Sequence, residues 1–305
     1  MKAVRFDTYG DIDVLKVVEV EAPVAVLGHV VVMVKAASIN PGEAAIRRGL
    51  LAERWPTTFP SGEGSDLAGG VDEVGEGVTG FAAGDEVLGW TDQRASHAEL
   101  VEVEAAKLVH RPGGVSWEAA GSLFVAGATA YAAVRAVALQ PGETVVVSGA
   151  AGGVGSLGVQ LARNAGAAVI GLASESHHAW LSAHGIVPVT YGDGVEERIR
   201  AAAGGPVDAF IDTFGAGYVE LALQLGVHTH RIETIIDYAA VTRYGVKGEG
   251  SATAASAEVL AELAELIAGR KLEVPIAAVY PLDQVREAYR ELEQRHALGK
   301  IVLVP

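Results

Sequence analysis

Residues 145–180 read VVVSGAAGGVGSLGVQLARNAGAAVIGLASESHHAW. The stretch opens on a valine run, and branched side chains of this kind favour an extended strand. A glycine-rich turn follows, after which Val154, Leu157 and Leu161 recur at the spacing of one helical face. The sequence therefore predicts a strand, a turn and a helix in that order.

The same alternation continues toward the carboxyl end of the chain. Strand-like runs separated by helical runs predict a parallel sheet with helices on both faces, that is, an α/β domain. The strand-like runs are AAVIGLA, VPVTYG, VDAFIDTFG and HRIETIID, and the helical runs are 154–165, 177–184, 195–203 and 216–226.

Residues 1 to about 115 have a different texture. Short runs alternate apolar and polar positions between glycine pairs, which predicts a β-rich barrel or sandwich. Helices at about 253–269 and 284–295, with the strands VPIAAVY and GKIVLVP, lie outside the βα repeat and are assigned partly to a return into this first domain. A length of 305 residues also favours two domains. The expected domains are 1–118 with 265–305, and 119–264.

The composition restricts the classes of function. A formal net charge of -15 repels polyanions, so neither nucleic acid nor an anionic membrane is an expected partner. Cysteine is absent, which excludes a disulfide framework and a thiolate metal site. The first residues, MKAVRFDTYGDIDV, lack the apolar core of a signal peptide, so we expect a cytoplasmic location. Residues 119–139 are long enough to span a bilayer, but their many Ala and Gly residues favour a buried helix.

The glycine turn has the properties of a pyrophosphate site. Gly152 has no Cβ, so the backbone can approach a phosphate closely, and Gly155 permits tight packing of helix against strand. The amides around Gly153 and Val154 open a helix and face an anion with the favourable end of its dipole. Ala150 stands where the dinucleotide fingerprint usually has its first glycine. We expect a dinucleotide here because the turn follows a strand and opens a helix.

The end of the next strand bears on which dinucleotide binds. An NAD site places a carboxylate about 20 residues past the glycine motif, and this chain has Ser174 at the strand tip. A neutral hydroxyl leaves room for a 2′-phosphate, to which the imidazoles of His177 and His178 could donate, and this favours NADPH. Tyr191, after the third strand run, is another candidate donor. The alternative is that Glu175 binds the ribose and both histidines are solvated.

Several segments together resemble the zinc-independent medium-chain dehydrogenase/reductase family, and within it the NADPH quinone oxidoreductases and related enone reductases. They come in family order at family spacing and cover essentially the whole chain. The segments are SINPGEAAIRRG at 38–49, SGEGSDLAGGVDEVGEGVTGFAAGDEV at 61–87, SHAELVEV at 96–103, VAGATAYAAV at 125–134, the opening glycine stretch and the tail GKIVLVP. The resemblance implies a GroES-like β-barrel domain, a Rossmann doubly wound parallel-sheet domain, a cleft between the two, and a homodimer.

The resemblance also assigns residues to the site. It implies that Asn40, the one expected catalytic residue, lies beside the nicotinamide and the substrate, and that Thr129 lies near the carboxamide. Lys300 matches a position near the cofactor or a domain joint, although a surface lysine fits the pattern equally well. The other implied cofactor-binding residues are Gly152, Gly153 and Val154 at the pyrophosphate, Ser174, His178 and Tyr191 around the 2′-phosphate, and Phe214, Gly215, Ile236, Asp237 and Tyr238 along the adenosine and nicotinamide cleft.

Two departures from family patterns affect the expected chemistry. Where zinc-dependent relatives carry metal ligands, this chain has Gly42 and the segment SGEG at 61–64, so a catalytic zinc site is not expected. Ala44 and Ala45 stand where several quinone reductases have a tyrosine, so the proton donor is unassigned. Three other tyrosines are more consistent with packing than with acid catalysis: Tyr131, Tyr218 and Tyr238.

The remaining polar residues have simpler explanations. A role in a turn or at a domain joint is a simpler explanation for Glu43, Glu63 and Asp66 than a catalytic carboxylate pair. His97 lies in a strand pattern and is expected to pack, while Arg47 and Arg48 either rim the substrate cleft or are solvated. His228 and His230 have no third metal ligand nearby in the sequence.

The expected chemistry is hydride transfer from NADPH to a small-molecule quinone or α,β-unsaturated carbonyl, without zinc. Backbone amides and Asn40 are the candidate donors to the anion that this transfer produces. Two alternatives stay open. One is an enoyl-thioester or polyketide-pathway reductase, against which the overall acidity argues weakly. The other is a non-catalytic NADPH-binding protein.

Overall fold

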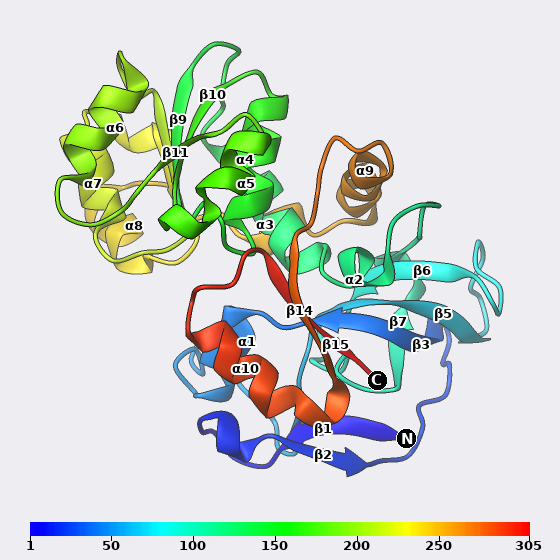
Figure 1. The fold of residues 1–305 in the computed structure, drawn as a ribbon. Coiled ribbons are helices and arrows are strands. Elements are labelled where there is room, and N and C mark those ends of the chain that lie inside the picture. Colours follow the sequence, from blue (N-terminus) through cyan, green and yellow to red (C-terminus); the bar gives the residue numbers. More distant parts are fainter. The chain divides into compact units, whose positions relative to one another are not determined.

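The computed structural model describes residues 1–305 and divides into two compact units (Figure 1). The first unit comprises Met1–Val125, Ser256–Ala268 and Ile276–Pro305, and the second comprises Ala126–Ala255 and Gly269–Pro275. The expected boundaries after residues 118 and 264 would cut helices α2 (Trp117–Ala120) and α9 (Ala257–Ala268). Both helices lie whole within the first unit.

The second unit is built on a five-stranded sheet in which every neighbouring pair is parallel. The strand order is β11 (Val187–Val189), β10 (Ala168–Leu172), β9 (Thr144–Ser148), β12 (Ala209–Asp212) and β13 (Ile232–Thr234). The chain starts in the centre at β9, moves outward to β11 and then returns to the other side of β9. This reversal is the topological switch of a doubly wound sheet, and it confirms the predicted fold class.

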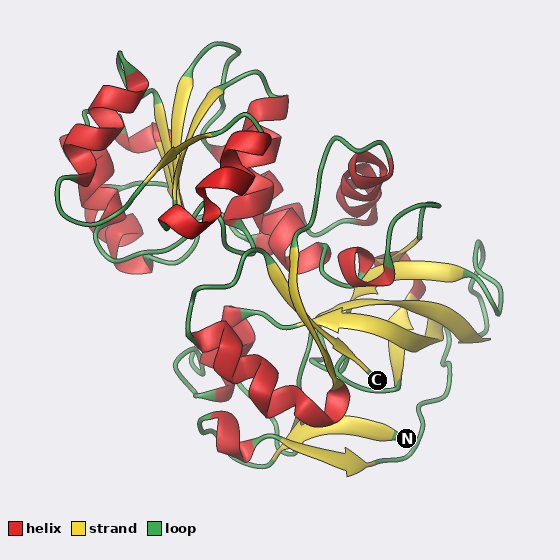
Figure 2. Cartoon of the chain, viewed as in Figure 1, coloured by secondary structure: helices red, strands yellow, loops and turns green.

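Helices cover both faces of this sheet (Figure 2). In Figure 1, α4 and α5 lie on one face, and α6 and α7 lie on the other. Because both faces are covered, the valines of β9 are fully buried, as expected for a central parallel strand. The helices are α3 (Phe124–Ala136), α4 (Gly155–Asn164), α5 (His178–Ala183), α6 (Val195–Ala203), α7 (Tyr218–Gln224) and α8 (Tyr238–Tyr244).

The first unit contains two sheets, and the predicted β-rich texture is confirmed. The larger, seven-stranded sheet has the order β14 (Ile276–Pro281), β15 (Lys300–Val304), β3 (His29–Ser38), β5 (Asp66–Val74), β6 (Glu86–Trp90) and β8 (Leu108–His110), with β7 (Leu100–Glu104) also paired to β3. The smaller sheet has the order β2 (Lys16–Glu19), β1 (Lys2–Phe6) and β4 (Ser61–Gly62).

Two helices place side chains inside the first unit. The short helix α1 (Pro41–Arg47) follows β3 directly, with Pro41 in its first turn, where proline's missing amide costs no hydrogen bond. α10 (Val285–Glu293) buries one stripe of side chains, including Tyr289, against the core that β1 and β15 share. Both helices point polar side chains into the same interior region.

The apolar run at 119–139 is divided between the short helix α2 and helix α3. No helix of the chain is both long enough and apolar enough to cross a membrane.

Candidate functional site

The glycine turn joins β9 to α4 at the carboxyl edge of the parallel sheet. A Cβ on Gly155 would lie 2.1 Å from the carbonyl oxygen of Gly149, so only glycine lets the helix start this close to the turn. The amides of Gly153 and Val154 are partly exposed at the start of α4. Amides at a helix N-terminus have no acceptor within the helix, and they bind anions well.

Asp212, at the end of β12, holds the ends of three strands together. Its fully buried carboxylate accepts the hydroxyl protons of Ser148 at 2.6 Å and Thr234 at 2.9 Å. The same carboxylate accepts the amides of Phe214 at 3.0 Å and Gly215 at 2.9 Å. Four neutral donors thus stabilise the charge without a cation. Asp212 thereby fixes β9, β12 and β13 around the topological switch, where parallel sheets bind ligands.

The predicted adenosine and nicotinamide positions follow β12 and β13 at this edge. Phe214, Ile236 and Tyr238 keep 37%, 41% and 43% of their surface exposed, so the edge offers an apolar wall. The carboxylate of Asp237 instead caps α8, because it accepts the amide of Ala240 at 2.9 Å.

Thr129 lies on α3 and is buried. Tyr218, an open candidate for an acid, has its ring packed against Phe210 and Phe214. Burial raises the pKa of Tyr218. Both observations favour the packing role that the sequence suggested for this tyrosine.

The end of β10 presents hydroxyl and imidazole groups. The Ser174 Oγ lies 2.8 Å from the Ser176 Oγ and 3.2 Å from the His177 Nδ1. The His178 Nε2 lies 3.4 Å from the carbonyl oxygen of Ala173, so this ring faces the backbone. His177 is therefore the imidazole that the fold brings to Ser174.

A cation that sequence reasoning missed braces the loop after β11. The Arg198 guanidinium donates to the carbonyl oxygens of Thr190 at 3.0 Å and Asp193 at 2.7 Å. It also donates to the carbonyl oxygen of Tyr191 at 3.3 Å, while the Tyr191 side chain is 45% exposed. In the sequence, Arg198 resembles any surface residue of a helix, and only the turn geometry shows that it folds back.

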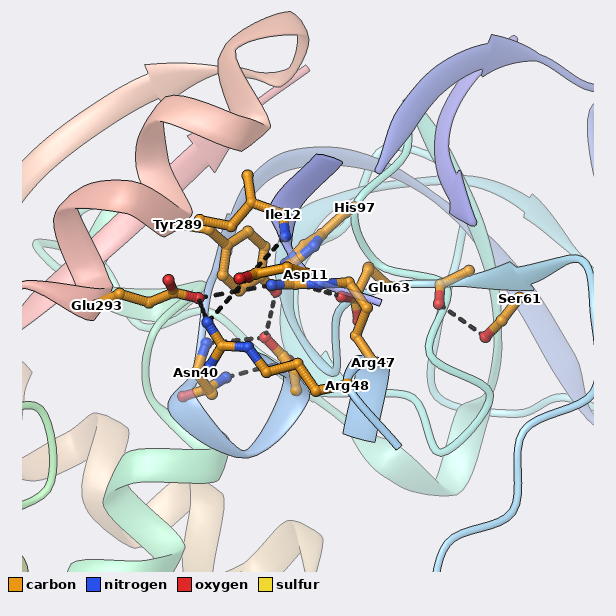
Figure 3. A network of polar contacts seen from close by, with 12 residues as sticks. Asp11, Ile12, Asn40, Arg47, Arg48, Ser61, Glu63, His97, Tyr289 and Glu293 are labelled. Carbon is orange, nitrogen blue, oxygen red and sulfur yellow. Dashed lines mark hydrogen bonds and ion pairs between the residues drawn. The ribbon is translucent and has the colours of Figure 1, made fainter. Parts of the chain in front are cut away.

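A second group of polar side chains is buried inside the first unit (Figure 3). We call it the charged cluster, and it consists of Ser38, Asn40, Glu43, Arg47, Glu63, Asp66, His97, Tyr289 and Lys300. Two of the predicted site residues, Asn40 and Lys300, come together here from opposite ends of the chain. The antiparallel pairing of β15 with β3 brings them together.

Every polar atom of the Asn40 amide has a partner. Nδ2 donates to the Asp66 carboxylate at 2.9 Å and to the Glu43 carboxylate at 3.2 Å. Oδ1 accepts from the Lys300 ammonium. Two acceptors on one side and a pure donor on the other fix the orientation of the amide. A substrate oxygen would have to displace a carboxylate to receive either amide hydrogen.

Lys300 is only 4% exposed, so its interpretation as a surface lysine is wrong. Besides Asn40, its Nζ lies 3.4 Å from the carbonyl oxygen of Ile39 and 3.8 Å from the Asp66 carboxylate. Burial lowers the pKa of Lys300, and the charges of Asp66 and Glu43 oppose this effect. The proton on this lysine is therefore held less firmly than that of a solvated lysine.

Glu43 forms a turn, as expected, and also connects the cluster. Its carboxylate accepts the backbone amide of Asn40 at 2.8 Å, which forms a capping box at the start of α1. It accepts the amide of Ser65 at 3.0 Å and the hydroxyl proton of Tyr289 at 3.2 Å. Burial raises the pKa of Tyr289 well above its usual value, so this hydroxyl stays a donor.

Arg47 is fully buried, so neither interpretation made for it from the sequence is right. Its guanidinium donates to the Glu63 carboxylate at 3.0 Å and lies 4.5 Å from the ring centre of Tyr289. Arg48, in contrast, is one-third exposed and pairs with Glu293 at 2.6 Å. Arg47 also lies 3.7 Å from the Glu293 carboxylate, so both arginines meet this carboxylate (Figure 3).

The charges of the cluster balance only if one carboxyl carries a proton. Burial, together with the charge of Glu43, raises the pKa of Glu63 to about 8. With Glu63 protonated at neutral pH, the carboxylates Glu43 and Asp66 match the cations Arg47 and Lys300. Uncompensated buried charge is costly, so this neutral arrangement is the stable one.

His97 packs inside the cluster as expected. Its Nε2 lies 3.1 Å from the carbonyl oxygen of Ser38, and burial lowers the pKa of the ring. The ring is therefore neutral. Within residues 1–305, no three or more His, Asp or Glu side chains are grouped so that they could hold a metal ion.

The fold and both sites define a two-domain α/β protein with a dinucleotide-type sheet edge, and comparisons with known proteins agree. A model described as "Alcohol dehydrogenase GroES-like domain" matches residues 27–141, and one described as "Zinc-binding dehydrogenase" matches residues 181–303. The structure of the quinone oxidoreductase from Coxiella burnetii is similar over 100% of this chain and 99% of its own, with a TM-score of 0.90 and 30% identity.

Two further relatives bear on activity. The Escherichia coli quinone oxidoreductase complexed with NADPH has a TM-score of 0.87 and 26% identity, and both chains are covered completely. Polyketide synthase GfsB of Streptomyces halstedii is 31% identical over 96% of this chain, which spans 5% of that much longer protein.

The chain belongs to the medium-chain dehydrogenase/reductase family, in its quinone oxidoreductase-like branch. It is an NAD(P)H oxidoreductase with a GroES-like domain and a Rossmann domain.

Proposed function

We propose that the protein is an NADPH-dependent reductase of quinones or α,β-unsaturated carbonyls that works without zinc. The observation that carries the proposal is the polar edge after β10. Ser174 is bonded there to Ser176 and His177, where an NAD site would use a carboxylate on the ribose. Hydroxyl and imidazole donors suit a 2′-phosphate, because they add no negative charge of their own.

The residues of the second unit fit a dinucleotide. The partly exposed amides of Gly153 and Val154 can bind a pyrophosphate. The exposed side chains of Phe214, Ile236 and Tyr238 can cover an adenosine and a nicotinamide ring. The other members of the proposed cofactor site are Thr129, Gly152, Ser174, His178, Tyr191, Gly215 and Asp237. Lys300, the remaining expected member, lies in the first unit and contacts Asn40. When bound, the reduced nicotinamide supplies a hydride.

In the first unit, the proposal assigns Asn40 to the position beside the nicotinamide and the acceptor. The charged cluster holds this side chain rigidly, because each of its polar atoms is bonded. Such rigidity favours orientation of a substrate, which is a large part of what a hydride-transfer enzyme contributes. The expected homodimer and cytoplasmic location stay predictions.

Zinc independence is supported by the donor groups at the family's zinc positions. Gly42 carries no side chain, and Glu63 of the SGEG segment is engaged by Arg47 at 3.0 Å. Elemental analysis of the purified protein tests this part, and a stoichiometric zinc would contradict it.

The main test measures binding and turnover separately. We expect calorimetry on nucleotide-stripped protein to give tighter binding of NADPH than of NADH. We expect NADPH oxidation with 1,4-benzoquinone or an α,β-unsaturated ketone. Absence of binding of either dinucleotide at millimolar concentration would overturn the proposal. Tight NADPH binding without turnover of any acceptor would favour the non-catalytic alternative.

A second candidate is an enoyl-thioester reductase, which the similarity to a segment of polyketide synthase GfsB supports. A crotonyl thioester in the same assay decides between the two. A kcat/KM at least about tenfold higher for the thioester than for benzoquinone would favour this candidate, since such a ratio corresponds to about 1.4 kcal/mol of transition-state binding.

A further inference from the structure

Reduction of a quinone or an enone adds a hydride and leaves a negative oxygen that needs a proton. Asn40 is the obvious donor from the family resemblance, but its two amide hydrogens are committed to Asp66 at 2.9 Å and Glu43 at 3.2 Å. Turning the amide over would place its oxygen against two carboxylates and its hydrogens against an ammonium. The donor must therefore be another group.

Lys300 is the cluster member with a proton to give. Its ammonium has three N–H bonds, of which one goes to the Asn40 amide oxygen and a second reaches the Ile39 carbonyl oxygen at 3.4 Å. The Asp66 carboxylate, at 3.8 Å, is too far for a hydrogen bond but near enough to stabilise the charge. One N–H bond is thus left without an acceptor in the protein.

The other titratable members of the cluster are less suited. Arg47 cannot deprotonate, and the Tyr289 hydroxyl is already bonded to Glu43 at 3.2 Å. The carboxyl of Glu63 accepts from Arg47 at 3.0 Å and makes no hydrogen bond to Asn40. His97 is neutral and directs its Nε2 to the Ser38 carbonyl oxygen. Lys300, in contrast, directly contacts the residue proposed to lie beside the acceptor.

We propose that Lys300 protonates the acceptor, a step that rests on the proposed function. The hydride adds to the acceptor with its electron pair, and the acceptor's π electrons move to oxygen. One N–H bond of Lys300 then breaks as an O–H bond forms, and the electron pair stays on Nζ. The neutral amine regains a proton from solvent, so each turnover consumes one proton. Asp66 and Asn40 hold the amine in place throughout.

The decisive experiment combines removal and rescue. In K300A, we expect kcat with benzoquinone or the enone to fall at least about 100-fold, while calorimetric affinity for NADPH stays within about threefold. Added ethylamine should raise the kcat of K300A at least about tenfold, in proportion to the concentration of protonated ethylamine. A residue with a merely structural role would not respond to the amine.

Two further variants keep the outcome clear. K300R retains the charge but does not release its proton, so we expect a rate as low as that of K300A. K35M changes an exposed lysine of β3 and should behave like the wild type. If K300A unfolds, the slow rate of folded K300R carries the test, together with a pH profile. The wild-type kcat should decline at high pH, where Lys300 loses its proton, and K300R should lack this decline.

The possible failures are distinguishable. A kcat of K300A within about threefold of the wild-type kcat overturns the role of Lys300 and leaves the proposed function unaffected. A K300A variant that loses NADPH affinity more than about tenfold, without amine rescue of the rate, identifies Lys300 as a cofactor ligand instead. A wild-type protein that oxidises no NADPH with any acceptor overturns both proposals.

Discussion

Both units bury carboxylates, but they stabilise them with different kinds of partner. In the second unit, four neutral donors surround Asp212, and no cation is near its hydrogen bonds. In the first unit, Glu43 and Asp66 share a cluster with Arg47 and Lys300. Hydroxyl and amide donors hold a carboxylate in one position and do not titrate near neutral pH. Ionisable partners also hold a carboxylate in position, but they carry protons that can be transferred.

The contrast suggests a division of labour. The edge of the parallel sheet needs only a fixed geometry to bind a dinucleotide, because the cofactor brings its own reactivity. The cluster around Asn40 has to hold an amide still and, on our proposal, deliver a proton. Four substitutions test this difference between the two units.

The largest effect is expected for Gly155→Ala in the second unit. The new Cβ would lie 2.1 Å from the Gly149 carbonyl oxygen, so turn and helix must separate, at a cost of at least about 4 kcal/mol. Urea unfolding and NADPH calorimetry measure the losses of stability and binding. Gly158→Ala, in the same helix, is the matched control, because nothing lies within 4 Å of its Cβ. It should gain up to about 1 kcal/mol. Equal free energies of unfolding and equal NADPH affinities for the two variants would refute the steric argument.

Asp212→Ala should come next, with a loss of about 3 kcal/mol in the free energy of unfolding. The substitution strands two hydroxyls and two amides that Asp212 now accepts, and stranded buried donors carry the full desolvation cost. Asp208→Ala, just before the same strand, removes one bond to the Thr144 amide and should cost about 1 kcal/mol. A loss for Asp212→Ala no larger than that of the control contradicts the role assigned to this carboxylate.

Ser174→Asp tests the cofactor edge without disturbing the fold. A carboxylate at this position repels a 2′-phosphate and can accept from a ribose hydroxyl. We expect the ratio of NADPH to NADH affinity to fall at least about tenfold, which is about 1.4 kcal/mol, with unchanged unfolding. Calorimetry with both dinucleotides measures the ratio. Ser182→Asp, at an exposed position of α5, is the control and should leave the ratio unchanged. No change in Ser174→Asp would contradict the proposed 2′-phosphate site.

Glu63→Gln should have the smallest effect below about pH 4.5, under about 1 kcal/mol, because glutamine imitates a carboxyl that is protonated there in both the folded and the unfolded state. Its effect is on pH dependence. A pKa raised to about 8 means that the folded state holds a proton that the unfolded state releases. This contribution to stability is therefore full below the ordinary pKa of 4.5 and falls by up to about 1.4 kcal/mol per pH unit until the pH passes about 8, so at pH 7 the Glu63→Gln protein should be more stable than the wild type.

Urea unfolding at pH 6.5, 7.5 and 8.5 separates this slope from the rest. Glu63→Gln should lack it, whereas Glu233→Gln provides a comparison in the second unit, where burial raises another glutamate pKa to about 8. Each of the two substitutions should reduce the change of the free energy of unfolding with pH, because each removes one titrating glutamate. A Glu63→Gln protein with the wild-type slope, or with a loss of more than about 3 kcal/mol at pH 7, would mean that Glu63 is ionised beside Arg47.

Local signals made the second unit predictable from sequence. The valine run, the glycine turn and the βα alternation are patterns of residues that are contiguous in the sequence. The structure has the elements that they predict, and helix α6 lies at the predicted residues 195–203. Asp212 and Arg198 were not predicted as site residues, since their partners are backbone groups and hydroxyls that only the tertiary fold brings together. A short polar side chain at the end of a buried strand run was the one available hint.

The charged cluster was beyond sequence reasoning for a physical reason. A buried arginine and a solvated arginine look the same in a sequence, so Arg47 was interpreted wrongly, as was Lys300 in its alternative as a surface residue. Glu43 carried a local signal, because the spacing from Asn40 matches a capping box. Long-range pairing of β15 with β3 placed the remaining partners, and no local pattern encodes that pairing.

That pairing also governs how the chain can fold during synthesis. Residues of the first unit occur at both ends of the sequence, and the chain passes between units after residues 125, 255, 268 and 275. On the ribosome, which releases the N-terminal part first, β3 must wait for β15 before Asn40 meets Lys300. The second unit can assemble as soon as residue 275 has emerged. The chain therefore completes the second unit before β15, and with it the charged cluster, has been translated.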